Sequence, residues 1–326
     1  MKKKEEGTAL ILVLLVVAII TVIGVTSVDR IQFGMKESSS ISLKQQSFWY
    51  ALGLESKASN FLEERNNARN LSNIMMFDED LPKIKVEIKG GYVEGSLEDL
   101  TTCFNLNGLV RLSEENKLQL NQSGVDQFKN LLSALRVDDF DQEKLIFSLV
   151  DWIDSNNFTE DATGAEDDFY TRLESPYQTA NQAIFNINEL MNIKNFEKDF
   201  LNLLLPFVCA TPKIGSSFVN VNAIKKNQPE ILVMLFGEKL SLASASNILA
   251  DRPLAGFVDR EELLSHPELS DLNFSNSSIN NIKLSSDFYK LTTKVKNFDY
   301  PYILSSYLEI LESGKVRVIQ RTQGVF

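Results

Sequence analysis

The chain has 326 residues, enough for one large or two modest domains, and its 44% hydrophobic residues, including 21 phenylalanines, can fill a sizeable core. Its formal net charge of −11 opposes binding to the phosphates of nucleic acids and of anionic lipids, so we expect no nucleic-acid ligand. Cationic partners and metal ions fit this charge better.

The first segment with a clear physical meaning is Thr8–Val28, which has no charged residue and follows a short leader with three lysines. At about 1.5 Å per helical residue it reaches roughly 31 Å, close to the thickness of a bilayer's hydrocarbon core. A cleaved secretory signal would be shorter and would end in an Ala-x-Ala site, and no such site precedes Asp29. A plain signal anchor is a second interpretation, with the basic leader in the cytoplasm and the bulk of the chain outside.

A third interpretation follows from Gly7, which stands directly before the apolar run. Here the sequence resembles the type IV pilin-like family, in which a prepilin peptidase cleaves after this glycine and leaves the helix in the membrane. The resemblance implies cleavage between Gly7 and Thr8 and methylation of the new N-terminus. Most members carry Glu at the fifth mature position, which is Leu12 here. Without that carboxylate the chain fits an end of a fibre better than its repeating body, a departure typical of the K-type minor pseudopilins of type II secretion systems.

The segment after the anchor, residues 29–71, is rich in helix formers with apolar residues at helical spacing, which predicts an amphipathic continuation of the same helix. After Pro82 the period changes to two, and Gly90-Gly91 separates two alternating runs, which predicts a β-hairpin. The runs 302–311 and 316–321, separated by Ser313-Gly314, predict a second hairpin.

Between the two groups of strands lie roughly 170 residues that look helical, a stretch too long for a structureless loop. We therefore expect an α+β, pilin-like fold, with the long N-terminal helix on an antiparallel β-sheet. The expected parts are a leader (1–7), a transmembrane helix (8–28), its amphipathic continuation (29–71), a sheet (82–109 and 284–326) and an inserted α-helical domain (110–283).

The inserted domain and its border repeat a short pattern of alternating apolar residues and asparagines, at Phe104–Leu109, Phe185–Leu190 and Val219–Ile224. The second Asn of each copy is expected to cap the following helix, unless the recurrence is chance. The third copy leads into residues 219–264, which resemble the helix-hairpin-helix arrangement of some DNA-binding modules. Its hairpin, Leu235–Leu240, holds a single glycine beside an acid. We interpret this part as a helical scaffold that binds no nucleic acid.

The strongest chemical signal is residues 151–170, which hold seven carboxylates, with no Lys or Arg between Lys144 and Arg172. Ca²⁺ takes six to eight oxygen ligands, although the spacing of an EF-hand is absent. By composition alone, a solvated acidic loop explains the segment as well as a metal site does. Interleaved aromatic residues, such as Trp152 and Tyr170, favour an ordered loop, and an ordered carboxylate cluster needs a counter-charge.

The same segment resembles the K-type pseudopilins most specifically, with Asp-Trp-x-Asp at its start, then Gly-Ala-Glu-Asp and a Tyr. In that family the segment binds calcium. The resemblance therefore implies a structural Ca²⁺ in this chain. The residues that it favours as ligands are Asp151, Asp154, Glu166, Asp167 and Asp168, with Asn156 as a weaker one.

Cys103 and Cys209 are the only cysteines. In an oxidising compartment they can pair, and the alternative is two separately buried thiols, because their distance cannot be read from the sequence. Catalysis has little support, since His266 is the only histidine and no nucleophile elbow or phosphate-binding loop occurs. We therefore do not expect an enzyme.

These features and the resemblance together predict a tip-located minor pseudopilin that initiates or caps the type II secretion pseudopilus for export of folded proteins. It would cross the inner membrane once, with a cytoplasmic N-terminus and a periplasmic bulk. Its expected partners are the I-, J- and H-type minor pseudopilins, the major pseudopilin and the prepilin peptidase. The alternatives are a minor pilin that initiates a type IV pilus, an anchored calcium-dependent extracytoplasmic enzyme, and a competence-type DNA-binding protein.

Overall fold

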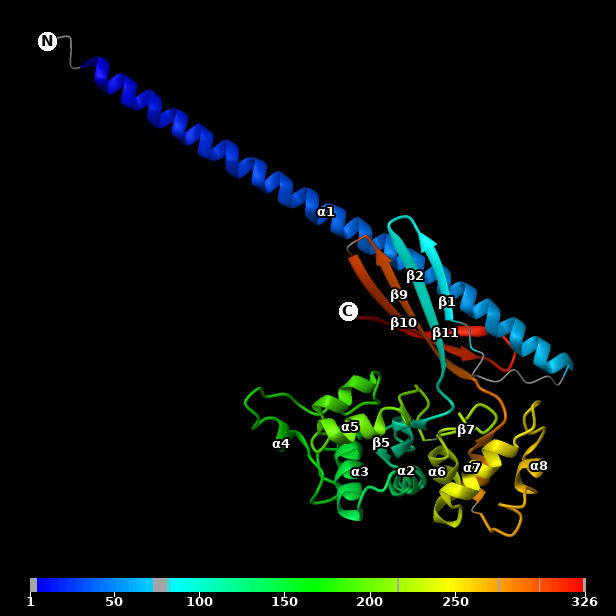
Figure 1. Ribbon diagram of the computed structural model, residues 1–326. Coiled ribbons are helices and arrows are strands. Elements are labelled where there is room, and N and C mark those ends of the chain that lie inside the picture. Colours follow the sequence, from blue (N-terminus) through cyan, green and yellow to red (C-terminus); the bar gives the residue numbers. More distant parts are fainter. Residues whose placement is uncertain are drawn as a thin grey trace.

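The computed structural model describes residues 5–72, 81, 83–215, 217–274, 276–298 and 300–324. A long helix, α1, projects from a head that consists of a sheet and a mainly helical insertion (Figure 1). Three parts of the sequence-based prediction lie outside the described residues: leader residues 1–4, Pro82, where the sheet was expected to begin, and the C-terminal residues 325–326.

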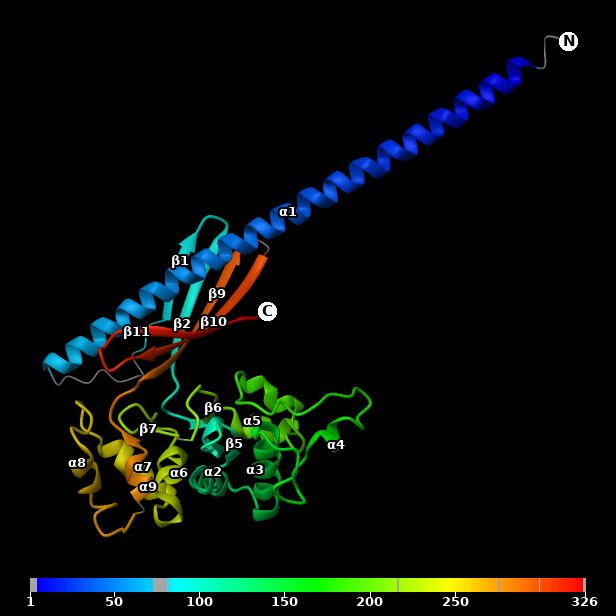
Figure 2. The same cartoon turned by 180° about the vertical axis from the view of Figure 1, so that it is seen from behind.

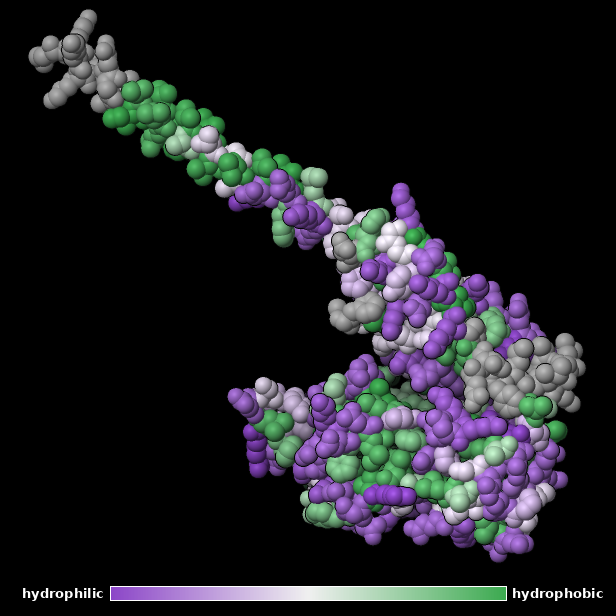
Figure 3. Space-filling view, in the orientation of Figure 1, coloured by the Kyte–Doolittle hydropathy of each residue, from purple (hydrophilic) through white to green (hydrophobic). Residues whose placement is uncertain are grey.

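Helix α1 (Glu5–Ser72) is continuous, and its first part is an apolar rod that is exposed on every side (Figure 3). The hydroxyls of Thr21, Thr26 and Ser27 donate to carbonyls three or four residues earlier, at 2.7–3.0 Å. These polar groups therefore need no water, as a lipid environment requires. Among the described residues, α1 is the one helix that is long and apolar enough to cross a membrane.

The second part of α1 lies on a five-stranded antiparallel sheet and buries Ala51, Leu54, Ala58 and Leu62 against it. This spacing of three to four residues gives one apolar face, as the amphipathic pattern predicted. In order across the sheet, the strands are β1 (Lys83–Ile88), β2 (Gly91–Asp99), β9 (Phe288–Asn297), β10 (Tyr300–Ile310) and β11 (Val316–Gly324). The expected combination of a long N-terminal helix and an antiparallel sheet is confirmed.

Both predicted hairpins are present, as the pairs β1–β2 and β10–β11. Gly90 (φ 89°) and Gly314 (φ 78°) occupy their turns in the left-handed region that favours glycine. Strand β9 joins the two hairpins by pairing with β2 on one side and β10 on the other. Residues that are far apart in the chain therefore form the middle of the sheet.

The insertion leaves the sheet after β2 and returns at β9, two strands that are neighbours in the sheet. We expected it to begin at residue 110, and this boundary is corrected to about residue 100. Strand β3 (Phe104–Asn105) pairs in parallel with β6 (Val208–Cys209), inside the insertion and not in the sheet. The alternating pattern of Phe104–Leu109 was interpreted as sheet because a short bridge and a long strand share the same period of two.

The insertion is built from short helices around one apolar core, with α2 packed against both α3 and α6. Figure 2 shows the insertion from behind, with α4 and α8 at its opposite ends. Its helices are α2 (Gln122–Ala134), α3 (Asp139–Ile153), α4 (Asp167–Tyr170), α5 (Lys198–Leu204), α6 (Glu230–Phe236), α7 (Leu242–Asp251), α8 (Arg260–Leu264) and α9 (Asn276–Asn280), with 3-10 turns η2 (Leu106–Leu109), η3 (Ile187–Asn192) and η4 (Gly237–Lys239). The remaining short strands are β4 (Val110–Leu112), β5 (Leu118–Leu120), β7 (Val219–Asn220) and β8 (Ile282–Lys283).

The asparagine repeats show that the insertion contains two units built alike. The second Asn of the first copy, Asn107, accepts from the amide of Ile184, and the second Asn of the third copy, Asn222, accepts from the amide of Phe257 in the same way. In all three copies the first Asn accepts from the amide of the second, as Asn105 does from Asn107. The prediction that the second Asn caps each helix is therefore wrong. The first Asn is the N-cap in the first two copies, and the second Asn of the first and third copies ties two distant segments together.

An ion pair between the buried Glu55 and the half-exposed Arg321 joins α1 to the last strand. Glu55 of α1 accepts two hydrogen bonds of 2.8 Å from Arg321 of β11 and one of 2.6 Å from Ser306 of β10. Burial alone would raise the pKa of Glu55, but the hydrogen bonds from Arg321 and Ser306 outweigh it and hold the pKa below its usual range. The pair therefore fixes the position of the sheet along the helix.

We expect Arg321→Met to destabilise the head by about 1–2 kcal/mol, because it leaves the buried Glu55 carboxylate without its half-exposed counter-charge. The matched control is Lys117→Met, which removes one partner of the exposed Lys117–Glu115 pair and should change stability little. Denaturant unfolding of the purified full chain measures both variants. Equal small effects would show that the Glu55–Arg321 pair does not hold the helix to the sheet.

Candidate functional site

The acidic segment begins in the last turn of α3 and continues as a loop to α4. Three of its carboxylates, Asp151, Asp154 and Glu166, point into the insertion and are 0%, 0% and 4% exposed. We call these three residues the acidic cluster. Burial of carboxylates is costly unless they are protonated, paired or bound to a metal.

The two aspartates of the cluster are only partly compensated by hydrogen bonds. The Asp151 Oδ1 accepts from the amide of Glu160 at 2.9 Å, while its Oδ2 has no hydrogen-bond partner. Burial raises the pKa of Asp151 to about 6, although the amide of Glu160 opposes the shift. Burial also raises the pKa of Asp154 to about 7, and the negative charges of Asp151 and Glu160 add to this effect.

Glu166 completes the cluster from the other end of the loop. Burial raises its pKa to about 7, and the charges of Asp151 and Asp154 raise it further. Its Oε1 is buried without a hydrogen-bond partner, its Oε2 accepts a long 3.4 Å bond from the Thr179 hydroxyl, and the amide of Asp167 opposes the rise in its pKa. Two orphaned carboxylate oxygens in a buried, mutually repelling cluster fit a bound cation, since a hard divalent ion takes oxygen ligands of this kind.

The other expected ligands are placed differently. The Oδ1 of Asp167 accepts hydrogen bonds from the amide and the hydroxyl of Thr179. The side-chain amide of Asn156 donates to Asp154 and so orients that carboxylate. Asp168 has a side chain that is 95% exposed beside Arg172, which removes it from the cluster. Within the described residues no group of three or more His, Cys, Asp or Glu side chains is already arranged as a metal-ligand set.

Sequence reasoning missed three residues that shape this site. Glu160 contributes its charge to both aspartates, and it was overlooked because the resemblance gave it no role. At Gly164 a Cβ atom would overlap the Asp151 Oδ2, so only glycine lets the loop approach the cluster. Lys194, which lies far along the chain, donates to the carbonyls of Gly164 (2.8 Å) and Thr163 (3.4 Å) and lowers the pKa of Asp151.

Aromatic side chains hold the two ends of the acidic loop together. Trp152 contacts Tyr170 edge-on, with 5.3 Å between ring centroids, and Tyr177 packs on Tyr170 at 5.2 Å. The Tyr170 hydroxyl accepts from the amide of Lys194. Phe158 does not take part, because its side chain is exposed at the surface. The loop is thus ordered by packing behind the cluster, as the interleaved aromatic residues indicated.

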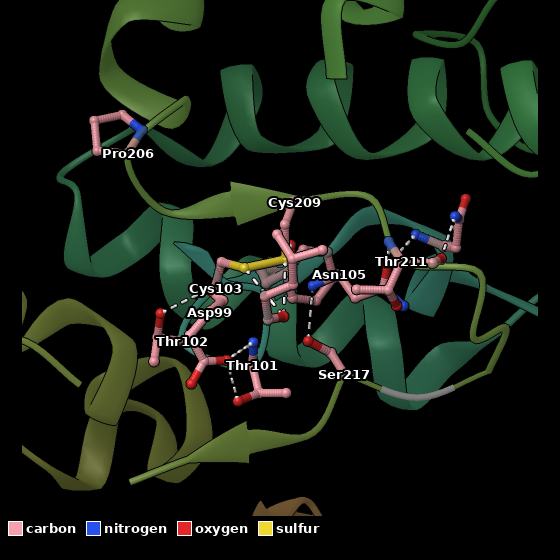
Figure 4. The surroundings of a disulfide bond; sticks show 12 residues. Asp99, Thr101, Thr102, Cys103, Asn105, Pro206, Cys209, Thr211 and Ser217 are labelled. Atoms are coloured by element: carbon pink, nitrogen blue, oxygen red, sulfur yellow. Dashed lines mark hydrogen bonds between the residues drawn. A yellow bond between two sulfur atoms is a disulfide. The ribbon is translucent and has the colours of Figure 1, made fainter. Parts of the chain in front are cut away.

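A disulfide joins Cys103 to Cys209, with 5.8 Å between their Cα atoms (Figure 4). Its sulfurs pack with Leu100, where the chain leaves the sheet, with Phe288, where it re-enters, and with Tyr307 of β10. The bond therefore lies at the junction between the sheet and the insertion and closes a loop of 106 residues. In the chain-entropy treatment, a loop of that length contributes about 4.7 kcal/mol to stability.

Gly7 and Thr8, the residues of the expected processing site, lie in the first turns of α1, and Leu12 follows on its exposed surface. His266 lies 3.5 Å from Asp251 and is tied into a turn near α8, away from the acidic cluster.

Comparison with known proteins gives a consistent result. Two family models, both described as type II secretion system protein K, match residues 102–213 and 219–284, which are the two units of the insertion. The crystal structure of the GspK-GspI-GspJ complex from enterotoxigenic Escherichia coli contains a chain with the same fold (TM-score 0.73, 23% identity, covering 89% of this chain and all of that one).

Curated relatives extend the similarity to the whole chain. The type II secretion system protein K of Pectobacterium carotovorum is 29% identical over 99% of this chain and 98% of its own, and that of Pseudomonas aeruginosa is 29% identical over 99% and 94%. The protein of the same name from Aeromonas hydrophila is 30% identical over 80% of both chains. With α1 as a single-pass membrane anchor and with these matches, the chain belongs to the type II secretion system protein K family and is a minor pseudopilin, a structural subunit of that system.

Proposed function

We propose that this minor pseudopilin stands at the tip of the pseudopilus and initiates or caps the fibre that exports folded proteins across the outer membrane. The observation that carries the proposal is the position of the insertion, which lies at the end of the head remote from the anchor (Figures 1 and 2). A further subunit stacked beyond this chain would meet the insertion and not a pilin-like sheet. Leu12, which replaces the carboxylate that a repeating subunit uses to hold its neighbour, supports the same position.

The partners of such a tip follow from the surface of α1. Beyond the membrane span, Ile31, Phe33 and Met35 are exposed on the helix and need apolar cover. Sister helices of I-, J- and H-type minor pseudopilins, and then the major pseudopilin, supply it. The solved complex of a similar chain with GspI and GspJ supports this partner class. The anchor crosses the inner membrane with its basic leader in the cytoplasm and its head in the periplasm, where the disulfide is stable.

The tip subunit acts as a scaffold and not as a catalyst. The acidic cluster is buried, and no histidine adjoins it among the described residues. An anchored calcium-dependent hydrolase would instead lose a measurable activity on replacement of Asp151 and Asp154. Membranes that contain the full chain, assayed against peptide, ester and glycoside substrates, test this alternative directly.

Maturation and assembly can be tested on the full chain in its own membranes. Prepilin peptidase should cleave after Gly7, so that N-terminal sequencing starts at a methylated Thr8, and sister minor pseudopilins should co-purify with the mature chain. Gly7→Leu should leave the leader attached and abolish co-purification, whereas the matched change Gly24→Leu, inside the span, should leave cleavage intact. An uncleaved wild-type chain in a host with active peptidase would contradict the proposal.

We further propose that a structural Ca²⁺ neutralises the acidic cluster. The support is the burial of Asp151, Asp154 and Glu166 together, with two carboxylate oxygens that lack partners. Glu160 and Asp167 are near enough to contribute charge. The bound ion would supply the positive charge that lets the three carboxylates stay ionised, and the loop between α3 and α4 would then hold its shape at neutral pH.

Calcium should stabilise the full chain in detergent, by about 2.7 kcal/mol at a hundredfold excess over Kd, and a chelator should reverse the effect. Asp154→Asn should abolish the calcium increment and also raise the melting temperature measured with chelator, because it relieves repulsion in the cluster. The matched control is Asp168→Asn, whose exposed side chain lies outside the cluster and should change neither value. A melting temperature that is indifferent to calcium in the wild type would refute the site.

The pKa values of the cluster give the sign of the pH dependence without calcium. Because the folded state holds protons up to about pH 6 to 7 that the unfolded chain releases near pH 4, stability in chelator should fall as pH rises from 5 to 8. Lys194 moderates this fall at Asp151, while Glu160 and Asp167 increase it. Thermal melts of wild type and Asp154→Asn measure it, and the variant should have the shallower slope. Equal slopes would exclude the cluster as the cause.

A further inference from the structure

A cleft opens at the junction between the sheet and the insertion, on the opposite face of the sheet from α1, and its volume is about 600 Å³. This is within the range of roughly 300–1,000 Å³ typical of pockets that enclose a ligand or a short peptide segment. We call it the junction cleft and define it by six of the residues that line it: Glu98, Lys290 and Tyr307 from the sheet, and Leu205, Pro206 and Lys225 from the insertion.

The floor of the junction cleft is rigid. Cys103 and Cys209 line it, and their disulfide crosslinks two segments of the insertion (Figure 4) and packs against Phe288 and Tyr307 of the sheet. Leu205 and Pro206 form an apolar wall beside the bond, and Leu205 remains 42% exposed. Because the disulfide and this wall hold the cleft in shape, a ligand that binds there pays no free-energy cost for ordering it.

The charge of the junction cleft is opposite to that of the whole chain. Three lysines (Lys83, Lys225 and Lys290) and two acids line it, in a protein with a net charge of −11. The Asp99 carboxylate accepts hydrogen bonds from the hydroxyls of Thr101 and Ser286. Glu98 lies directly across from Lys290 on the neighbouring strand.

Two of the amines pair with no carboxylate of the described residues. Lys83 and Lys225 are exposed and form no ion pair within the described part of the chain. A positive, partly apolar recess on an acidic protein attracts a segment that carries carboxylates next to an apolar side chain.

We infer that the junction cleft receives an acidic, apolar segment from the head of a neighbouring minor pseudopilin. This inference rests on the proposed function, in which sister helices lie along α1 and bring their heads to the level of the sheet. A neighbour in that position lies beside the sheet and below the insertion, where the cleft opens. The cleft then anchors the neighbour's head, while the helices anchor its stem.

The test uses the full chain in its own membranes together with its sister pseudopilins, with a photocrosslinking residue at Leu205. A second chain carries the same residue at Leu254, which is 90% exposed and does not line the cleft. Only the Leu205 position should crosslink to a sister head, and the mapped peptide should contain an Asp or Glu. Lys225→Glu should reduce that crosslink about tenfold, and Lys117→Glu, far from the cleft, should not.

A charge reversal in the partner tests specificity. Changing the mapped Asp or Glu of the partner to Lys should restore the crosslink to the Lys225→Glu chain. Co-purification through the helices should survive Lys225→Glu, which separates this inference from the proposed function. Co-purification without a Leu205 crosslink would overturn the inference alone. A crosslink only to this chain's own acidic residues 78–80, or to an exported protein, would also overturn it. Loss of all co-purification in the wild type would overturn both.

Discussion

The packing of one apolar stripe of α1 against the inner face of the sheet is the contact on which the head depends. Ala51, Leu54, Ala58 and Leu62 form that stripe, and the buried Glu55 sets its register against β11. Because α1 covers one face of the sheet and hydrogen bonds join its strands, the insertion can leave only at a strand end. It leaves between β2 and β9, at the end away from the anchor, and the position of the insertion in the fibre follows from this.

Two local devices then order the insertion. The disulfide crosslinks two segments at the base of the insertion, next to the sheet, and the aromatic contacts of Trp152 and Tyr170 fix the acidic loop to α3. The repeated use of Asn107 and Asn222 to tie distant segments gives both units the same frame. The acidic loop is the part of the first unit that has no counterpart in the second, where a short turn joins α7 to the segment that begins at Phe257. Electrostatic strain is therefore confined to one loop of an otherwise regular scaffold.

Local patterns allowed much of this fold to be predicted. The anchor followed from the length of an uncharged run, and the hairpins followed from period-two patterns that flank Gly90 and Gly314, because these features depend on neighbouring residues only. Features that depend on distant contacts were not predictable. Whether an asparagine caps a helix or joins two distant segments depends on the backbone groups that lie opposite its side chain. The beginning of the insertion depends on the pairing of Phe104 with Val208. For the same reason, the composition of residues 151–170 did not indicate which carboxylates are buried, as Asp154 is, and which are exposed, as Asp168 is.

We propose that this chain ends the fibre, because its insertion occupies the place of a further subunit. Electron microscopy of pseudopili that carry an epitope in the exposed loop at Leu254 measures this most directly. The account predicts one label per fibre, at the end remote from the membrane. Labels at regular intervals along the fibre would contradict it.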